Sequence, residues 1–353
     1  MYRFLVCELK SGRVLDEAPF TIEGGLSRQL QGYGSGRLNL PVREDSCPAN
    51  WEQLVLPWRS LVLVLDEGDR IVSHGIPTNR LRAGGGVVGF PCVTVEGYLL
   101  RRHVPSRAYR NRDQALIAQD LAAVCADSVG LPLVFDTPLT GVFRDRDYAD
   151  DENATVYDRL QQLAAVQGGF NWAMDVEWTD DSHQQVRYVF RTGYPFLGNR
   201  SPNPEHVFDL PGNITGYEFD ERWGDGDAAT HVRGFGEGDG DTKPMSEPVV
   251  DTVREAAGWP RLEERRNFSG VSVQSTLDGH TRAAAAQLFG GQQVITLTAR
   301  DGSGTSLGDL SLGDTARVEI RDDELTLDEV MVVVGWSLTP GSGEFKPTLA
   351  RLE

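Results

Sequence analysis

The first hundred residues consist of short apolar segments separated by turn residues. The clearest segment is Leu61-Val62-Leu63-Val64-Leu65, which is followed by the turn sequence Glu67-Gly68-Asp69 and by a second apolar segment at residues 70–77. This order predicts a strand, a tight turn and a second strand. Further strands are expected at residues 2–9, 14–22, 37–42 and 87–100. Because helical periodicity is almost absent, this region is expected to form a closed barrel or a sandwich.

The pattern changes at about residue 105. The sequence Asn111-Arg112-Asp113-Gln114 has the character of a capping box, and the apolar periodicity after it predicts a helix that ends near Gly130. A second helix is predicted from Thr155 to the stop signal Gly168-Gly169. Two strands are expected at residues 170–178 and 186–192. The middle third is therefore predicted to be α+β.

A stretch rich in proline, glycine and asparagine at residues 194–204 marks a boundary or a long loop. One helix is predicted after it, at residues 281–289. Strands are expected at residues 213–220, 230–235, 294–299, 316–320, 330–337 and 345–352. The expected domains are thus residues 1–105, 106–205 and 206–353, with β-rich ends around a mixed middle.

Composition excludes several classes of protein. With 353 residues, 40% hydrophobic and 24% charged, the chain is expected to be globular with more than one core. No apolar run approaches the roughly 20 residues that span a bilayer. Glu8 and Lys10 interrupt the apolar amino terminus, which favours synthesis in a cytoplasm over secretion. The net charge of −18 argues against specific nucleic-acid binding.

No catalytic or cofactor signature is found. The six histidines and four cysteines lack metal-motif spacing, and Ser35, Ser303 and Ser342 lie directly between glycines without forming a nucleophile elbow. The acidic pairs Asp175/Glu177 and Glu218/Asp220 would permit glycosidase chemistry, but such pairs are expected by chance among 52 acidic residues. We therefore expect no enzyme activity and no cofactor.

An acidic, glycine-rich loop at residues 223–241 leaves two readings open. Asp225, Asp227, Asp239 and Asp241 could hold calcium, although the EF-hand order is absent. A solvated loop without an ion is favoured, because glycine and aspartate serve turns readily.

Five arginines without an intervening acid stand out against the acidic background: Arg101, Arg102, Arg107, Arg110 and Arg112. One reading is an exposed linker. The other is a subunit interface, in which the guanidinium groups contact acids of a neighbouring copy. The acids considered are Asp147, Asp150, Asp151 and Glu152, or Asp322, Asp323 and Glu324.

Four segments carry a resemblance to a known family. They are the strand pair within residues 61–76, the helix followed by Gly168-Gly169-Phe170-Asn171-Trp172, the strand Thr230-His231-Val232-Arg233-Gly234-Phe235 that leads into a glycine- and acid-rich loop, and Leu310-Ser311-Leu312-Gly313-Asp314. In this order they resemble the baseplate hub, or minor tail protein, of long-tailed bacteriophages.

The resemblance implies a mainly β fold in which two β-barrel-like tube domains flank the α+β middle. It further implies a homotrimer that forms a ring with an axial channel at the tail tip of the virion. Its implied partners are the distal tail protein, the carboxyl terminus of the tape-measure protein, and distal fibre or receptor-binding proteins. The alternative is a carbohydrate-binding or cell-wall-binding tail module, motivated by seven tryptophans and nine tyrosines.

Overall fold

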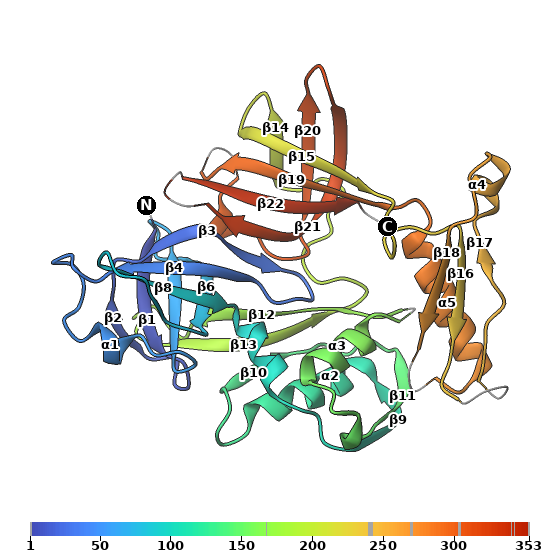
Figure 1. Ribbon diagram of the computed structural model, residues 1–353, viewed down its shortest axis with the longest axis horizontal. Helices are drawn as coiled ribbons and strands as arrows, with labels where there is room; N and C mark the ends of the chain where they lie inside the picture. The colour runs from blue at the N-terminus through green and yellow to red at the C-terminus, as the bar shows by residue number, and fades with distance from the viewer. Residues whose placement is uncertain are drawn as a thin grey trace.

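A computed structural model describes residues 2–166, 168–238, 243–268, 271–302, 305–339, 341 and 343–351. The amino-terminal strands pair in the antiparallel order β3-β4-β8-β6-β5-β1-β2, with the short β7 beside β8 (Figure 1). Their bounds are β1 (Arg3–Glu8), β2 (Val14–Glu17), β3 (Thr21–Gln29), β4 (Ser35–Pro41), β5 (Ser60–Leu65), β6 (Ile71–Pro77), β7 (Leu81–Arg82) and β8 (Val87–Val93), with the short helix α1 (Trp51–Leu54) between β4 and β5.

Two predicted strands in this region were too long. The segment expected at residues 14–22 is divided, because Pro19 has no N–H to donate and lies between β2 and β3. The segment expected at residues 87–100 ends at Val93 and continues as the 3-10 helix η1 (Val95–Arg101). Val95 and Leu99 of η1 are fully buried, so their apolar character reflects helical packing.

The strand β5 is buried on both faces, which explains its continuous apolar sequence. Leu61, Leu63 and Leu65 face a core shared with the middle segment. Val62 and Val64 face a second core, shared with the carboxyl-terminal strands. The hairpin predicted from this run is confirmed, since β5 pairs antiparallel with β6.

The middle segment contains one small sheet, one two-stranded ribbon and two helices. The sheet has the order β10-β13-β12, and the ribbon pairs β9 with β11. The bounds are β9 (Arg107–Asp113), α2 (Gln114–Ala122), the 3-10 helix η2 (Ala123–Ala126), β10 (Leu133–Asp136), β11 (Phe143–Tyr148), the 3-10 helix η3 (Asp150–Glu152), α3 (Val156–Ala164), β12 (Asn171–Trp178) and β13 (Val186–Gly193). The α+β character predicted for this segment is confirmed.

The two predicted helices are present, with corrected bounds. Thr155 and Asp158 form a complete capping box at the start of α3. Gln167, at the predicted end of that helix, lies outside the described residues. At α2 the residues 111–113 belong to β9, and the Asp113 side chain caps the helix by accepting the N–H of Ala115. The α-helix ends at Ala122 and not near Gly130, because the chain tightens into η2.

The carboxyl-terminal strands form an antiparallel run, β15-β19-β22-β21, extended by β20 beside β21 and by β14 beside β20. They are β14 (His206–Leu210), β15 (Ile214–Arg222), β19 (Gln292–Arg300), β20 (Thr315–Arg321), β21 (Thr326–Leu338) and β22 (Glu344–Arg351), with the 3-10 helix η5 (Leu307–Asp309) before β20. The last strand was predicted to reach Leu352, which lies outside the described residues.

The closed barrel expected from the sequence is not found among the described strands. β14 and β15 follow each other in the chain, yet no ladder joins them, so the carboxyl-terminal sheet stays open there. It is instead continuous with the amino-terminal sheet, because Gly335–Leu338 of β21 pair with Leu26–Gln29 of β3. One 14-stranded sheet therefore runs through both β-rich ends.

Residues between β15 and β19 form a separate α+β unit, which lies at the right of Figure 1. It has a sheet of order β17-β16-β18 and a small apolar core with Val232, Ala285 and Leu288. The bounds are β16 (His231–Phe235), β17 (Val249–Val250), α4 (Thr252–Ala256), β18 (Glu263–Asn267) and α5 (Gln274–Leu288). The sequence predicted one helix from residue 281, but α5 begins at Gln274 and packs on a sheet of its own.

Candidate interaction site

The five arginines singled out in the sequence do not form a linker. Arg107, Arg110 and Arg112 lie in β9, which pairs antiparallel with β11. Arg101 ends η1, and Arg102 follows it. The hypothesis that these arginines form an exposed linker is therefore wrong for the three strand residues, because they belong to a hydrogen-bonded ribbon.

Each of these arginines contacts a group of the same chain. Arg110 pairs with Asp147 at 2.8 Å and Arg112 with Asp120 at 3.0 Å. Arg107 donates to the carbonyl oxygen of Asp120 at 3.0 Å. Arg102 pairs with Asp127, and the guanidinium of Arg101 lies 5.5 Å from the ring centre of Trp58. The fold thus brings Arg107, Arg110 and Arg112 onto one ribbon and directs the other two to different partners.

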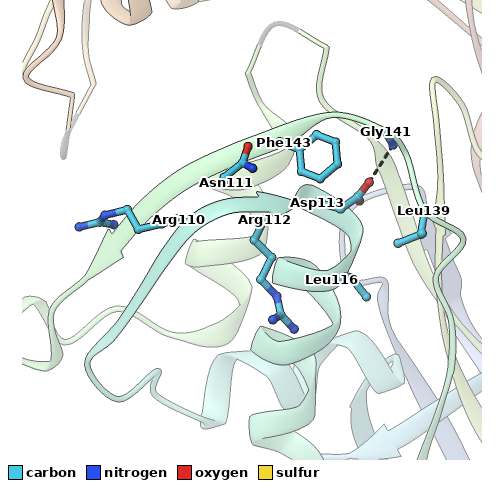
Figure 2. Close-up of a pocket in the computed structure, with 8 residues that line it drawn as sticks. All are labelled: Arg110, Asn111, Arg112, Asp113, Leu116, Leu139, Gly141 and Phe143. Atoms are coloured by element: carbon cyan, nitrogen blue, oxygen red, sulfur yellow. Dashed lines mark hydrogen bonds between the residues drawn. The ribbon is translucent and has the colours of Figure 1, made fainter.

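Arg110 and Arg112 border a shallow cavity of about 360 Å³ on the middle segment. Figure 2 shows its lining, which comes from β9, the start of α2, the turn before β11 and the first residue of β11: Arg110, Asn111, Arg112, Asp113, Leu116, Leu139, Gly141 and Phe143. We call this cavity the arginine pocket. The side chains of Arg110 and Arg112 remain 60% and 41% exposed, so both are accessible from outside.

Asp113 holds the pocket wall together. Its carboxylate accepts the N–H groups of Ala115 (2.9 Å), Thr140 (3.0 Å) and Gly141 (2.7 Å), the last of which is drawn in Figure 2. Burial alone would raise the pKa of Asp113, but these N–H groups lower it below its ordinary value. The carboxylate therefore stays ionised and fixes the turn of residues 139–141 against α2.

Two exposed apolar residues in the pocket were missed in the sequence. Leu139 is 70% exposed and Phe143 is 57% exposed. The surrounding sequence, residues 136–145, has no sustained helical or alternating apolar pattern that would mark them. Large apolar side chains beside exposed arginines are typical of protein contact surfaces.

A second cavity, of about 560 Å³, lies between β11 and the separate unit. Its walls include Arg144 and Arg146 of β11, Arg159 of α3, and Val273 and His280 of the other unit. Burial, together with Arg146 and Arg144, lowers the pKa of His280 to about 4, so its ring is neutral at neutral pH. Phe143 lines both cavities, so the two cavities adjoin each other.

The first acidic pair of the sequence, Asp175/Glu177, lies in a partly buried junction of ion pairs. Arg28 of β3 pairs with Asp175 of β12 and donates to the carbonyl oxygen of Met174 at 2.8 Å. Arg191 of β13 pairs with both Asp175 and Glu177. Burial would raise the pKa of Asp175, but Arg28 and Arg191 lower it below its ordinary value. An acid held in its ionised form is unsuited to protonate a glycosidic oxygen.

The same junction joins β3 to β12 of the middle segment and to β21 of the carboxyl-terminal strands. The guanidinium of Arg28 lies 5.5 Å from the ring centre of Trp336 in β21. Glu96 of η1, fully buried, accepts the N–H of Met174 at 3.3 Å, and burial raises its pKa. Nearby, Nε2 of buried His74 accepts the N–H of Val95 at 3.1 Å. Arg28 therefore links the amino-terminal sheet to the middle segment and to the carboxyl-terminal sheet.

The remaining sequence candidates are not assembled into sites. Glu218 and Asp220 lie on β15, where Asp220 pairs with Arg222 at 2.6 Å and Glu218 is exposed. No group of three or more His, Cys, Asp or Glu residues placed to hold a metal occurs within the described ranges. Asp239 and Asp241 of the acidic loop, and Ser303 and Ser342, lie outside those ranges. Ser35 begins β4 and donates its N–H to the Ser27 hydroxyl at 2.9 Å, which is a contact between the neighbouring strands β4 and β3.

Neither a scan of protein-family models nor a search of the curated proteins finds a match for this chain. Solved structures do match. The tail protein from Neisseria meningitidis MC58 has a TM-score of 0.61 at 15% identity, covering 99% of this chain and 96% of that chain. The 43 kDa tail protein of prophage MuSo2 from Shewanella oneidensis has a TM-score of 0.63 at 12% identity, covering 99% and 98%. The prophage tail protein gp18 from Listeria monocytogenes EGD-e has a TM-score of 0.52 at 12% identity, covering 99% and 94%.

The chain therefore has the fold of phage tail proteins. The resemblance inferred from its sequence is confirmed at this level, over almost the whole length of the chain and of its structural neighbours. Among the described helices, none is both long enough and apolar enough to cross a membrane.

Proposed function

We propose that this chain is a structural protein of a phage tail, and specifically the baseplate hub at the tail tip. The observation that carries the proposal is the tail-protein fold, which extends over 99% of the chain. A hub joins the tail tube to the distal attachment apparatus, so it must transmit force without coming apart. The partly buried Arg28 junction supports such a role, because it links β3 to β12 and to β21.

In the proposed assembly the chain forms a homotrimeric ring around an axial channel. Residues 1–105 and 206–353 supply the tube domains, and residues 106–205 face outward. The proposed partners are the distal tail protein, the carboxyl terminus of the tape-measure protein, and fibre or receptor-binding proteins. The net charge of −18 suits a channel through which DNA slides without binding, since like charges repel.

The proposed role requires no catalysis. Asp175 and Glu177 are neutralised by arginines, and neither they nor Glu218 and Asp220 line the two cavities described above. The structural neighbours are tail proteins, which favours a structural role over an enzymatic one.

The function is tested on assembled tails. Antibody–gold labelling of purified particles, viewed in negative stain, should place this chain at the tail tip. Label spread along the tube, or absent from tails that contain their other proteins, would contradict the proposal. For the isolated protein, light scattering after size-exclusion chromatography should give the mass of three copies of the chain.

A carbohydrate-binding tail module is the second candidate, favoured by one surface feature. Trp223 and Trp259 have ring centres 4.5 Å apart and ring planes tilted by 36°, and Trp259, which lies between α4 and β18, is 41% exposed. Exposed tryptophan rings are suited to stack on sugars. Binding of host cell-wall glycan that is abolished by Trp259→Ala would support this candidate.

A further inference from the structure

The arginine pocket has the composition of a contact site, and its internal ion pairs do not close it. The partners of Arg110 and Arg112 are themselves accessible, since the side chain of Asp147 is 69% exposed and that of Asp120 is 37% exposed. Exposed ion pairs of this kind contribute little stability, so another carboxylate can replace either partner at small cost. Beside them, Leu139 and Phe143 offer apolar surface that the fold leaves uncovered.

The guanidinium groups of Arg110 and Arg112 make a carboxylate-bearing partner the matching one, and the chain offers two acidic segments. In the first, Asp147 and Glu152 are already engaged, with Arg110 at 2.8 Å and with Arg159 at 2.7 Å, whereas Asp150 and Asp151 are exposed. This segment directly follows the ribbon that carries the pocket, since Asp147 lies in β11 and the other three acids form η3. We therefore assign the contact to the other segment, which lies on a different sheet.

The second segment is the tip of the β20–β21 hairpin, residues 322–325. Asp322 organises this tip: its carboxylate accepts the N–H groups of Glu324 (2.9 Å) and Leu325 (2.7 Å) and the hydroxyl of Tyr217 (2.8 Å). These bonds lower the pKa of Asp322 below its ordinary value, so the turn stays fixed by an ionised group. Asp323 and Glu324 are exposed, and their carboxylates make no hydrogen bond or ion pair within the part of the chain that the structure describes.

The pocket and the tip cannot meet within one molecule. In Figure 1 the loop that joins β20 to β21 is at the top of the view, and the β9–β11 ribbon is at the lower right, beside α2 and α3. A contact between them must join two copies. Because the two surfaces differ, the contact is head-to-tail, and repetition of such a contact closes a ring when the rotation between copies permits it.

We infer that the arginine pocket receives Asp323 and Glu324 from the β20–β21 tip of a second copy of this chain. Arg110 and Arg112 bind the two carboxylates, since a guanidinium matches a carboxylate in shape as well as in charge. The aliphatic part of the tip then covers Phe143 and Leu139. This inference rests on the proposed function, because it names the surfaces through which the proposed ring assembles.

Charge reversal of both surfaces tests the inference. The first variant is Arg110→Glu/Arg112→Glu, the second is Asp323→Arg/Glu324→Arg, and the third combines all four changes, which restores the net charge of the natural chain. Glu44→Arg/Asp45→Arg is the matched control, because it reverses two adjacent exposed acids in a different loop. Self-association of each full chain is measured by sedimentation velocity at two salt concentrations, and circular dichroism verifies that each variant is folded.

We expect each double reversal at the contact to weaken self-association roughly tenfold or more, since like charges then face each other. The fourfold variant should recover association, and the control should leave it unchanged. Added salt should weaken association of the natural chain. Recovery in the fourfold variant separates a broken contact from a damaged fold.

Two results would overturn the inference. One is an unchanged association constant in either folded double variant, and the other is a natural chain that stays monomeric at its highest soluble concentration. Neither result bears on gold labelling of tails. If the label marks the tail tip while these variants associate normally, the proposed function stands and only the named contact is wrong.

Discussion

Two sets of arginines in this molecule make the same kind of ion pair in opposite surroundings. At the junction, Arg28 is only 13% exposed and Asp175 only 26%. On the β9–β11 ribbon, Arg110 is 60% exposed and Asp147 is 69% exposed. Water can replace a lost partner on the ribbon but not at the junction. Burial therefore decides whether an arginine holds the fold together or is available to another molecule.

The largest expected effect is the loss of Arg28. Arg28→Met should lower the free energy of unfolding by roughly 3 kcal/mol, because the carboxylates of Asp175 and Glu96 would lose the cation that compensates for their burial. Urea denaturation at neutral pH measures it. Arg187→Met is the control, since Arg187 is 48% exposed, and it should cost less than about 1 kcal/mol. Equal losses in the two variants would show that the junction is no more structural than the surface.

The junction should also make stability depend on pH through His74. Burial, followed by repulsion from Arg28, lowers the pKa of His74 to about 3 in the folded chain. Its ordinary value is near 6.5, so below that pH the unfolded chain binds a proton that the folded chain does not. This contribution to stability is complete above pH 6.5 and is lost as the pH falls toward 3.

His74→Gln retains an acceptor for the N–H of Val95 and removes this titration. The stability of the natural chain should fall relative to that of the variant by on the order of 1 kcal/mol per pH unit between pH 6 and pH 4. Urea denaturation across this range measures the difference. Parallel pH profiles for the two proteins would mean that His74 is protonated in the folded chain.

The smallest effect is expected on the ribbon. Arg110→Ala and Arg112→Ala should each change the free energy of unfolding by less than about 1 kcal/mol, because both pairs are exposed. Thermal and urea unfolding measure this. A loss as large as that of Arg28→Met would place the ribbon among the structural ion pairs and erase the contrast with the junction.

Local patterns in the sequence were sufficient to predict most of the longer helices and strands. The apolar run of β5 and the capping residue Thr155 of α3 each depend on neighbours in the chain, so these two elements were predicted. By contrast, α5 was predicted too short, because Gly279 and the polar residues of its first turns have low helix propensity. Packing of α5 against the adjacent sheet, with Leu277 and His280 buried, stabilises the helix where its intrinsic helix propensity is low.

Only part of the candidate site could be predicted from the sequence. The arginines stood out by charge, but β9 was missed because its sequence, Arg107 to Asp113, has no alternating apolar face and only Tyr109 and Asp113 are buried. Leu139 and Phe143 were missed because exposure is set by the tertiary fold. The pairing of β21 with β3 is equally absent from local sequence, since register between distant strands is set by packing.

That pairing has a consequence for how the chain is made. Gly335 of β21 pairs with Gln29 of β3, about 300 residues earlier in the chain. Ribosomes deliver residues from the amino terminus onward, so β3 must wait exposed along one side until β21 is synthesised. Contacts of such long sequence separation form slowly. A host cell that makes this protein must therefore shield an unfinished sheet edge for nearly the whole of translation.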